Sequence, residues 1–160
     1  MKSIKKISLT LLLFLSSLSV FVSVPKKVSA LFFDQSYYDA ISWIYIYQDT
    51  YTKSYNCLGW ATGSMVFEWP SSWGTGATQL QVNAYLALQG YKNTTLNFGA
   101  QSTKIVAYGP SANSIVHFSK VTPTEVTAKW GSLERFSHAL SMDPYYANSD
   151  YGSPRVYYYK

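Results

Sequence analysis

The chain has 160 residues, with 13 basic and 8 acidic side chains, 18% aromatic residues and one cysteine. Five of the basic residues lie within residues 1–30, so residues 31–160 are neutral, with 8 basic and 8 acidic side chains. This balance excludes a nucleic-acid-binding surface, which would concentrate positive charge. One cysteine excludes an internal disulfide, and residues 31–160 are enough for one domain with a packed core.

Residues 1–30 have the three parts of a secretion signal. Lysines near the N-terminus form a charged start, an apolar segment runs from 7 to 24, and residues 28–30 are small enough for cleavage. We therefore expect a secreted, extracellular protein that begins at Leu31 and has no stable membrane association after cleavage. An uncleaved N-terminal membrane anchor is the alternative, because the apolar segment approaches the length that spans a bilayer.

Helical patterns come first along the remaining chain, and strand patterns follow. A short helix or irregular lead-in is expected within 34–47, although 43–47 could also form a strand, and Thr78 is a possible N-cap for a helix over 77–89. Strands are expected over 104–108, 114–121, 126–130 and 155–159, with loops over 69–76 and 91–102 and a loop or short helix over 131–141. The first three strands form an antiparallel meander, so the fold class is α+β.

The residues around the only cysteine predict the start of another helix. Asn56 is an acceptable N-cap, and the helix is expected to run from Cys57 until Trp69 and Pro70 end it. In a first turn, unpaired backbone N–H groups and the helix dipole favour a thiolate. The position therefore predicts a reactive thiol with a lowered pKa. A lone cysteine is also commonly a small buried apolar residue, which is the competing interpretation.

Two histidines are available as partners for a cysteine nucleophile. His117 stands in an expected strand between apolar residues and is expected to be half-buried against the helices, whereas His138 lies in a loop-like stretch. Both have structural alternatives: a core histidine bonded to a carbonyl, and a merely exposed one. Two histidines without clustered carboxylates are too few for a zinc site, and scattered acids do not indicate glycoside chemistry. A cysteine with a histidine indicates an activated thiol, with no metal or cofactor.

The sequence Tyr-Asn-Cys-Leu-Gly-Trp at 55–60, followed by a meander that carries His117, resembles the compact papain-like cysteine peptidases and amidases of bacteria. These include NlpC-type and CHAP-type cell-wall hydrolases. A nearer resemblance is to an uncharacterised exported branch with an Asn-Cys-Leu-Gly-Trp opening, then Ala-Lys-Trp-Gly, here at 128–131, and then a histidine, here His138. The resemblance covers residues 54–160 and implies a papain-like fold, with N-terminal helices packed on an antiparallel meander.

The resemblance also implies roles for individual residues. Cys57 is expected to be the nucleophile and His117 the base that takes its proton. A third polar residue orients such a histidine from the adjacent strand, and Lys129 or Thr127 is expected opposite His117. Neither is the histidine, asparagine or carboxylate usual at that place, and His138 could fold back to fill it.

The implied oxyanion donor is the side chain of Asn56 or Tyr55. The function that follows is a secreted thiol hydrolase that cleaves an amide bond in a peptide or in the peptide part of a peptidoglycan-type substrate. A catalytically silent papain-like module, which binds glycan or a protein partner through its aromatic surface, is the alternative. An acyl transferase that uses the same cysteine and histidine is a third possibility.

Overall fold

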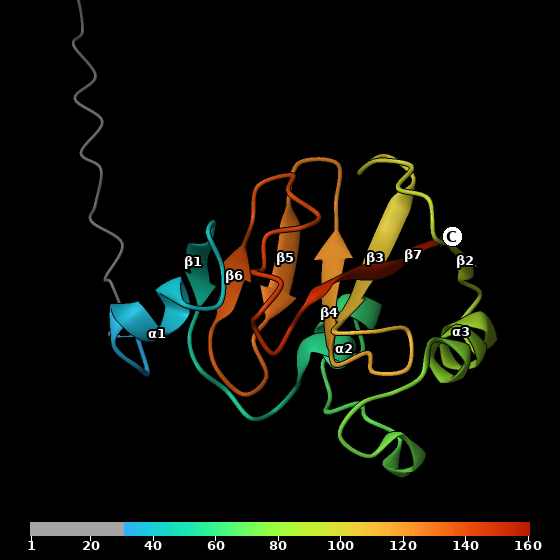
Figure 1. The fold of residues 1–160 in the computed structure, drawn as a ribbon, viewed down its shortest axis with the longest axis horizontal. Helices are drawn as coiled ribbons and strands as arrows, with labels where there is room; N and C mark the ends of the chain where they lie inside the picture. The colour runs from blue at the N-terminus through green and yellow to red at the C-terminus, as the bar shows by residue number, and fades with distance from the viewer. Residues whose placement is uncertain (1–30) are drawn as a thin grey trace, which may run out of the picture.

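The computed structural model of the chain describes residues 31–160 (Figure 1). The expected secretion signal, and the alternative membrane anchor, lie outside the described residues. The helices are α1 (Gln35–Asp39), α2 (Cys57–Thr62) and α3 (Gln79–Leu88), with a 3₁₀ turn η1 (Ser71–Trp73). The strands are β1 (Ile46–Asp49), β2 (Lys92–Thr94), β3 (Thr103–Gly109), β4 (His117–Val121), β5 (Val126–Lys129), β6 (Arg135–Ser137) and β7 (Ser153–Tyr159).

The strands form one seven-stranded sheet in the order β1-β6-β5-β4-β3-β7-β2, and all neighbouring pairs are antiparallel. The expected α+β class is confirmed. The expected meander is confirmed as well, because β3, β4 and β5 are consecutive neighbours. A hydrogen bond of 2.9 Å from the N–H of Thr122 to the carbonyl of Glu125 closes the turn between β4 and β5. Strand β7 returns to pair with β3 (Figure 1).

Two short strands lie where the sequence predicted none, and a third lies at the end of the ambiguous segment. β2 falls in the expected loop over 91–102, β6 in the expected loop or short helix over 131–141, and β1 begins within 34–47. β2 and β6 have 3 residues and β1 has 4, which is too short for an alternating pattern to stand out. Their stability comes from pairing: β2 pairs with β7, β6 pairs with β5, and β1 pairs with β6.

The helix that carries the cysteine is much shorter than the sequence predicts. Asn56 caps it as expected, with its side-chain oxygen accepting from the N–H of Gly59 at 3.0 Å. The helix ends at Thr62 because Gly63 adopts a left-handed φ of 84°, which glycine tolerates without a Cβ clash. The chain then folds back on itself instead of continuing to Trp69.

The second expected helix is confirmed as α3, and its N-cap is the one the sequence indicated. Thr78 accepts a hydrogen bond from the N–H of Gln81, and the Gln81 side chain accepts one from the N–H of Thr78. This reciprocal pair is a capping box, which satisfies two otherwise unpaired backbone donors. The cap fixes the place where the chain leaves the loop after η1.

The sheet separates two hydrophobic cores, because side chains along a strand alternate between its faces. On β3, Ile105 and Ala107 pack with α2 and α3 in the first core, whereas Val106 and Tyr108 belong to the second. The second core is covered by α1 and by the irregular segment between β6 and β7, which contributes Tyr145. Helices α2 and α3 therefore lie on one face of the sheet, and the aromatic segment before β7 lies on the other (Figure 1).

Candidate active site

Cys57 is the first residue of α2 and a free, buried cysteine, with 4% of its surface exposed. Burial raises the pKa of its thiol to about 11, although the backbone amides of Phe118, Leu58 and Cys57 and the charge of Lys129 act in the opposite direction. The expected lowering of the pKa is therefore wrong. The helix start does direct amides at the sulfur, but removing a thiolate from water costs more than these amides return.

The side chain of Asn56 holds the start of α2 through three hydrogen bonds. Its oxygen accepts from the N–H groups of Gly59 and Glu68, at 3.0 and 3.2 Å, and its Nδ2 donates to the Glu68 carbonyl at 2.7 Å. The residue thus joins the helix start to the returning chain. Its role as an oxyanion donor stays a prediction, and the second N–H of Nδ2 is the one that would serve it, because the first donates to the Glu68 carbonyl.

The two β5 residues expected to orient His117 lie on the α2 face of the sheet. Thr127 accepts a hydrogen bond of 3.0 Å from the indole N–H of Trp60. Lys129 is fully buried, donates to the carbonyls of residues 131 and 133, and lies 5.7 Å from the ring centroid of Tyr55. Burial lowers the pKa of Lys129 to about 8. Among the hydrogen bonds of residues 31–160, none joins either side chain to His117.

Tyr55, the other candidate oxyanion donor, is also buried on this face. Its ring lies 6.1 Å from that of Trp60, and Lys129 lies over it. These contacts place Tyr55 as packing between α2 and the end of β5. Its role as a donor stays a prediction.

His117 is fully buried, but on the face of the sheet opposite to α2. It is the first residue of β4 and pairs with Tyr108, which belongs to the second core. Its ring stacks on Tyr151 with centroids 3.9 Å apart and planes 12° apart, and its Nε2 lies 2.8 Å from the hydroxyl of Tyr145. The sequence predicted a half-buried ring against the helices, and alternation along the strand instead turns it to the aromatic side.

One ring nitrogen of His117 is left without a partner. Its Nδ1 is buried, and no hydrogen-bond partner for it exists among the described residues. Burial lowers the pKa of this imidazole well below its ordinary value, and the neighbouring His138 adds to the effect. The ring is therefore a neutral base at pH 7, held in place by one hydrogen bond and one ring stack.

His138 is buried as well, contrary to its loop-like sequence context. Its Nδ1 lies 2.6 Å from the carbonyl oxygen of Ile44, and its Nε2 lies 3.1 Å from the hydroxyl of Tyr145. Burial lowers its pKa to about 4. His138 does fold back towards His117, as considered from the sequence, but it reaches that ring through Tyr145. Tyr145 was not predicted, because it is one of 15 tyrosines and lies in an irregular segment.

Cys57 and His117 meet at the start of β4 from opposite faces of the sheet. The N–H of Phe118, the residue after His117, favours the Cys57 thiolate, and Phe118 and Cys57 share the first core. The thiol thus lies against the peptide that links His117 to Phe118. Within residues 31–160, no hydrogen bond joins the thiol to either histidine. The two expected catalytic residues are neighbours through the backbone of β4 and not through a direct bond.

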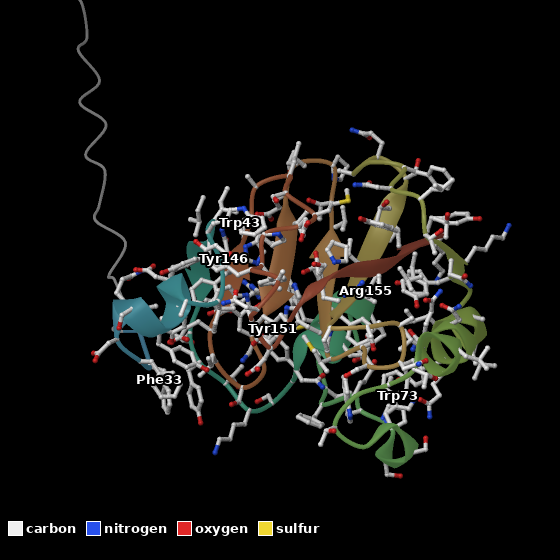
Figure 2. The ribbon with its side chains drawn as sticks, in the orientation of Figure 1. Phe33, Trp43, Trp73, Tyr146, Tyr151 and Arg155 are labelled. Atoms are coloured by element: carbon white, nitrogen blue, oxygen red, sulfur yellow. The ribbon has the colours of Figure 1, made fainter. Side chains whose placement is uncertain are left out.

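Tyr151 separates the buried His117 from the protein surface. One cavity of about 240 Å³ is bordered by Tyr151, Tyr37 and Asp150, and another of about 400 Å³ is bordered by Tyr151 together with Phe33 and Tyr37. Figure 2 shows Tyr151 over the middle of the molecule and Phe33 at the edge that carries α1. The ring that stacks on His117 is thus also a wall of two surface hollows.

Other kinds of site find less support in the described part of the chain. No group of three or more histidine, cysteine, aspartate or glutamate side chains there could hold a metal ion. No helix within residues 31–160 is long and apolar enough to cross a membrane.

The fold and the site define an α+β domain with a buried cysteine at the start of helix α2 and a buried histidine at the start of the central strand β4. Residues 46–159 match a family described as a domain of unknown function (DUF7689), so the chain belongs to that family. The matched range holds all seven strands and both Cys57 and His117, and it begins after α1. Comparison with curated proteins and with solved structures returned no match.

Proposed function

We propose that the protein is a papain-like thiol hydrolase that cleaves an amide bond in a peptide or in the peptide part of a cell wall. Cys57 is the nucleophile, and His117 is the base. The observation that carries the proposal is the Nδ1 atom of His117, which is buried and unpartnered among the described residues, while the Cys57 thiol contacts the backbone N–H of the next residue, Phe118. Buried polar atoms normally find a partner, so an unpaired base one residue away from the backbone contact of a thiol is a candidate for chemistry.

The papain-like assignment is part of the same proposal. A cysteine at the start of a helix, packed on an antiparallel meander, is the arrangement which the resemblance implied, although His117 lies on the opposite face of that meander. The order of these elements along the chain, α2 before β4, agrees with it. We also propose that the protein acts outside the cell, with residues 1–30 as the export signal, and that its partner is a peptide or peptidoglycan-type substrate.

The site performs its chemistry from a neutral pair. Burial raises the pKa of the thiol to about 11 and lowers that of the imidazole, so neither group is charged at pH 7. The transfer first requires a movement that brings His117 Nδ1 to the thiol, because the two lie on opposite faces of the sheet. As the sulfur bonds to the substrate carbonyl carbon, Nδ1 then takes the thiol proton, and it gives the proton to the leaving amine as the carbon–nitrogen bond breaks. Water then attacks the thioester, with Nδ1 as its base, and releases the acid and the thiol.

Substrate approaches from the side of Tyr151. The thiol and both histidines are buried, so the reaction requires a movement that exposes them. Tyr151 is the ring between His117 and the two surface cavities, and its displacement opens a path to Nδ1. The aromatic residues that border the larger cavity suit stacking on an extended peptide or on a sugar.

The test compares residues 31–160 with a Cys57→Ala variant on purified cell walls and on a peptide library. New amino termini, detected by mass spectrometry, are expected with the wild type, and the rate should fall by a factor on the order of 10³ or more in the variant. Persistent activity in Cys57→Ala would show that another group is the nucleophile. No product from either substrate would contradict the hydrolase.

A second candidate function is binding without catalysis, and the burial of Cys57 favours it. A sealed thiol with a raised pKa behaves as a small apolar residue. The larger cavity then serves as a binding surface, bordered by the exposed rings of Phe32, Phe33 and Tyr37. This function predicts that wild type and Cys57→Ala sediment equally with cell walls and that neither releases any product.

A further inference from the structure

Three buried side chains form one hydrogen-bonded chain on the second face of the sheet. The hydroxyl of Tyr145 lies 2.8 Å from Nε2 of His117 and 3.1 Å from Nε2 of His138. The chain ends at Nδ1 of His138, which lies 2.6 Å from the carbonyl oxygen of Ile44. All three side chains are buried from water, so each must find its hydrogen-bond partners among neighbouring protein groups.

The carbonyl at one end fixes the direction of every bond in this chain. A carbonyl oxygen only accepts, so Nδ1 of His138 carries a proton. Since burial lowers the pKa of His138 to about 4, the ring is neutral at pH 7 and its Nε2 offers a lone pair. The single hydroxyl proton of Tyr145 therefore points to His138. The oxygen of Tyr145 can then only accept from His117, whose Nε2 carries a proton in turn.

We propose that Tyr145, itself oriented by His138, is a positioning residue that holds His117 in its Nε2–H tautomer and leaves Nδ1 unprotonated. The opposite tautomer places two lone pairs face to face at 2.8 Å and leaves a buried N–H without an acceptor. The stack on Tyr151 and the edge-to-face contact with Tyr145 hold the plane of the ring. The catalytic meaning of this tautomer rests on the proposed function, but the tautomer itself does not.

The test is the pattern of ring nitrogen shifts in ¹⁵N-histidine-labelled protein at pH 7. We expect His117 as the Nε2–H form and His138 as the Nδ1–H form, with the two rings assigned through a His117→Gln variant. In Tyr145→Phe, His117 should lose its fixed tautomer and show exchange between the two forms. Tyr108→Phe is the matched control, because Tyr108 is a buried tyrosine that packs against Tyr145, and no hydrogen bond among the described residues joins its hydroxyl to either histidine.

Each outcome separates this inference from the hydrolase. A wild-type His117 in the Nδ1–H form overturns the inference by itself, even if Tyr145→Phe does not fold. An unchanged His117 tautomer in a folded Tyr145→Phe overturns it as well. If the wild type turns over substrate, Tyr145→Phe should lower kcat by a factor on the order of 10² with little change in KM. Tyr108→Phe should leave kcat unaltered. A wild type without turnover but with the expected tautomers rejects the hydrolase and retains the positioning role.

Discussion

At the scale of single residues, burial governs the chemistry of this site more than the helix start does. The amides at the start of α2 stabilise a thiolate, yet the pKa of Cys57 is raised because the sulfur is sealed from water. The same burial keeps His117 and His138 neutral. The proposed catalytic groups are therefore uncharged in the folded protein, and the proposed hydrolysis requires movement of a covering side chain.

Tyr151→Ala should speed the reaction of Cys57 with iodoacetamide at pH 8 by about tenfold or more, because Tyr151 covers His117 and lies close enough to Cys57 for the two to interact electrostatically. The labelling rate is followed by intact-protein mass spectrometry. Tyr146→Ala is the control, since Tyr146 lies in the same irregular segment but packs on Trp43 (Figure 2). Equal rates in the two variants would mean that Tyr151 does not control access to the thiol.

Acid should destabilise the protein through its buried histidines. The pKa of His138 is lowered from 6.5 to about 4, so the unfolded chain binds a proton first as the pH falls. The contribution of His138 to the free energy of unfolding should be nearly constant above pH 6.5. It should decrease by about 3 kcal/mol between pH 7 and pH 4. Urea unfolding across this range measures it. A His138→Gln variant that shows the same decrease would contradict the assignment.

At the scale of elements, two glycines determine where α2 ends and how the chain returns. Gly63 ends the helix with a left-handed φ, and nothing lies near the place of its absent Cβ. Gly59 is different, because a Cβ there would lie 1.9 Å from the carbonyl oxygen of Val66 on the returning chain. The return is thus packed directly onto the helix, which keeps Cys57 against β4.

Gly59→Ala should therefore destabilise the protein more than Gly63→Ala does. Overpacking against a backbone carbonyl is expected to cost about 3 kcal/mol, whereas a left-handed alanine in open space costs about 1 kcal/mol. Urea unfolding of the two variants, read against the wild type, provides the comparison. A smaller loss in Gly59→Ala than in Gly63→Ala would show that the returning chain shifts easily.

The sequence predicted elements with strong local signals and missed those that depend on distant partners. The N-cap of α2 at Asn56, the N-cap of α3 at Thr78 and the meander all follow from neighbouring residues, and the structure confirms them. The short strands β2 and β6 exist through pairing with strands far away in the chain. The early end of α2 does not follow from the sequence pattern, because apolar residues continue at helical spacing beyond Gly63, whose left-handed φ ends the helix.

At the scale of the whole molecule, the sheet brings the candidate site together from both of its faces. Cys57 comes from the side of α2, and His117 points into the second core with Tyr145 and Tyr151. Cys57 and His117 were singled out from the sequence, since they are rare residue types in suitable elements. The sequence does not predict that Cys57 and His117 lie on opposite faces, because this depends on the register of β4. It does not predict the contact of Tyr145 with both histidines either, because Tyr145 lies in an irregular segment.

The most direct test of the central claim is the reaction of the folded protein with a peptide that carries a chloroacetamide group. Intact-protein and peptide mass spectrometry report the rate and the position of labelling at pH 7. We expect one adduct, at Cys57, and a rate lower by a factor on the order of 10² in His117→Gln, which fills the space of the ring without supplying its base. Equal rates in the wild type and His117→Gln, or labelling that occurs only after unfolding in urea, would contradict the account.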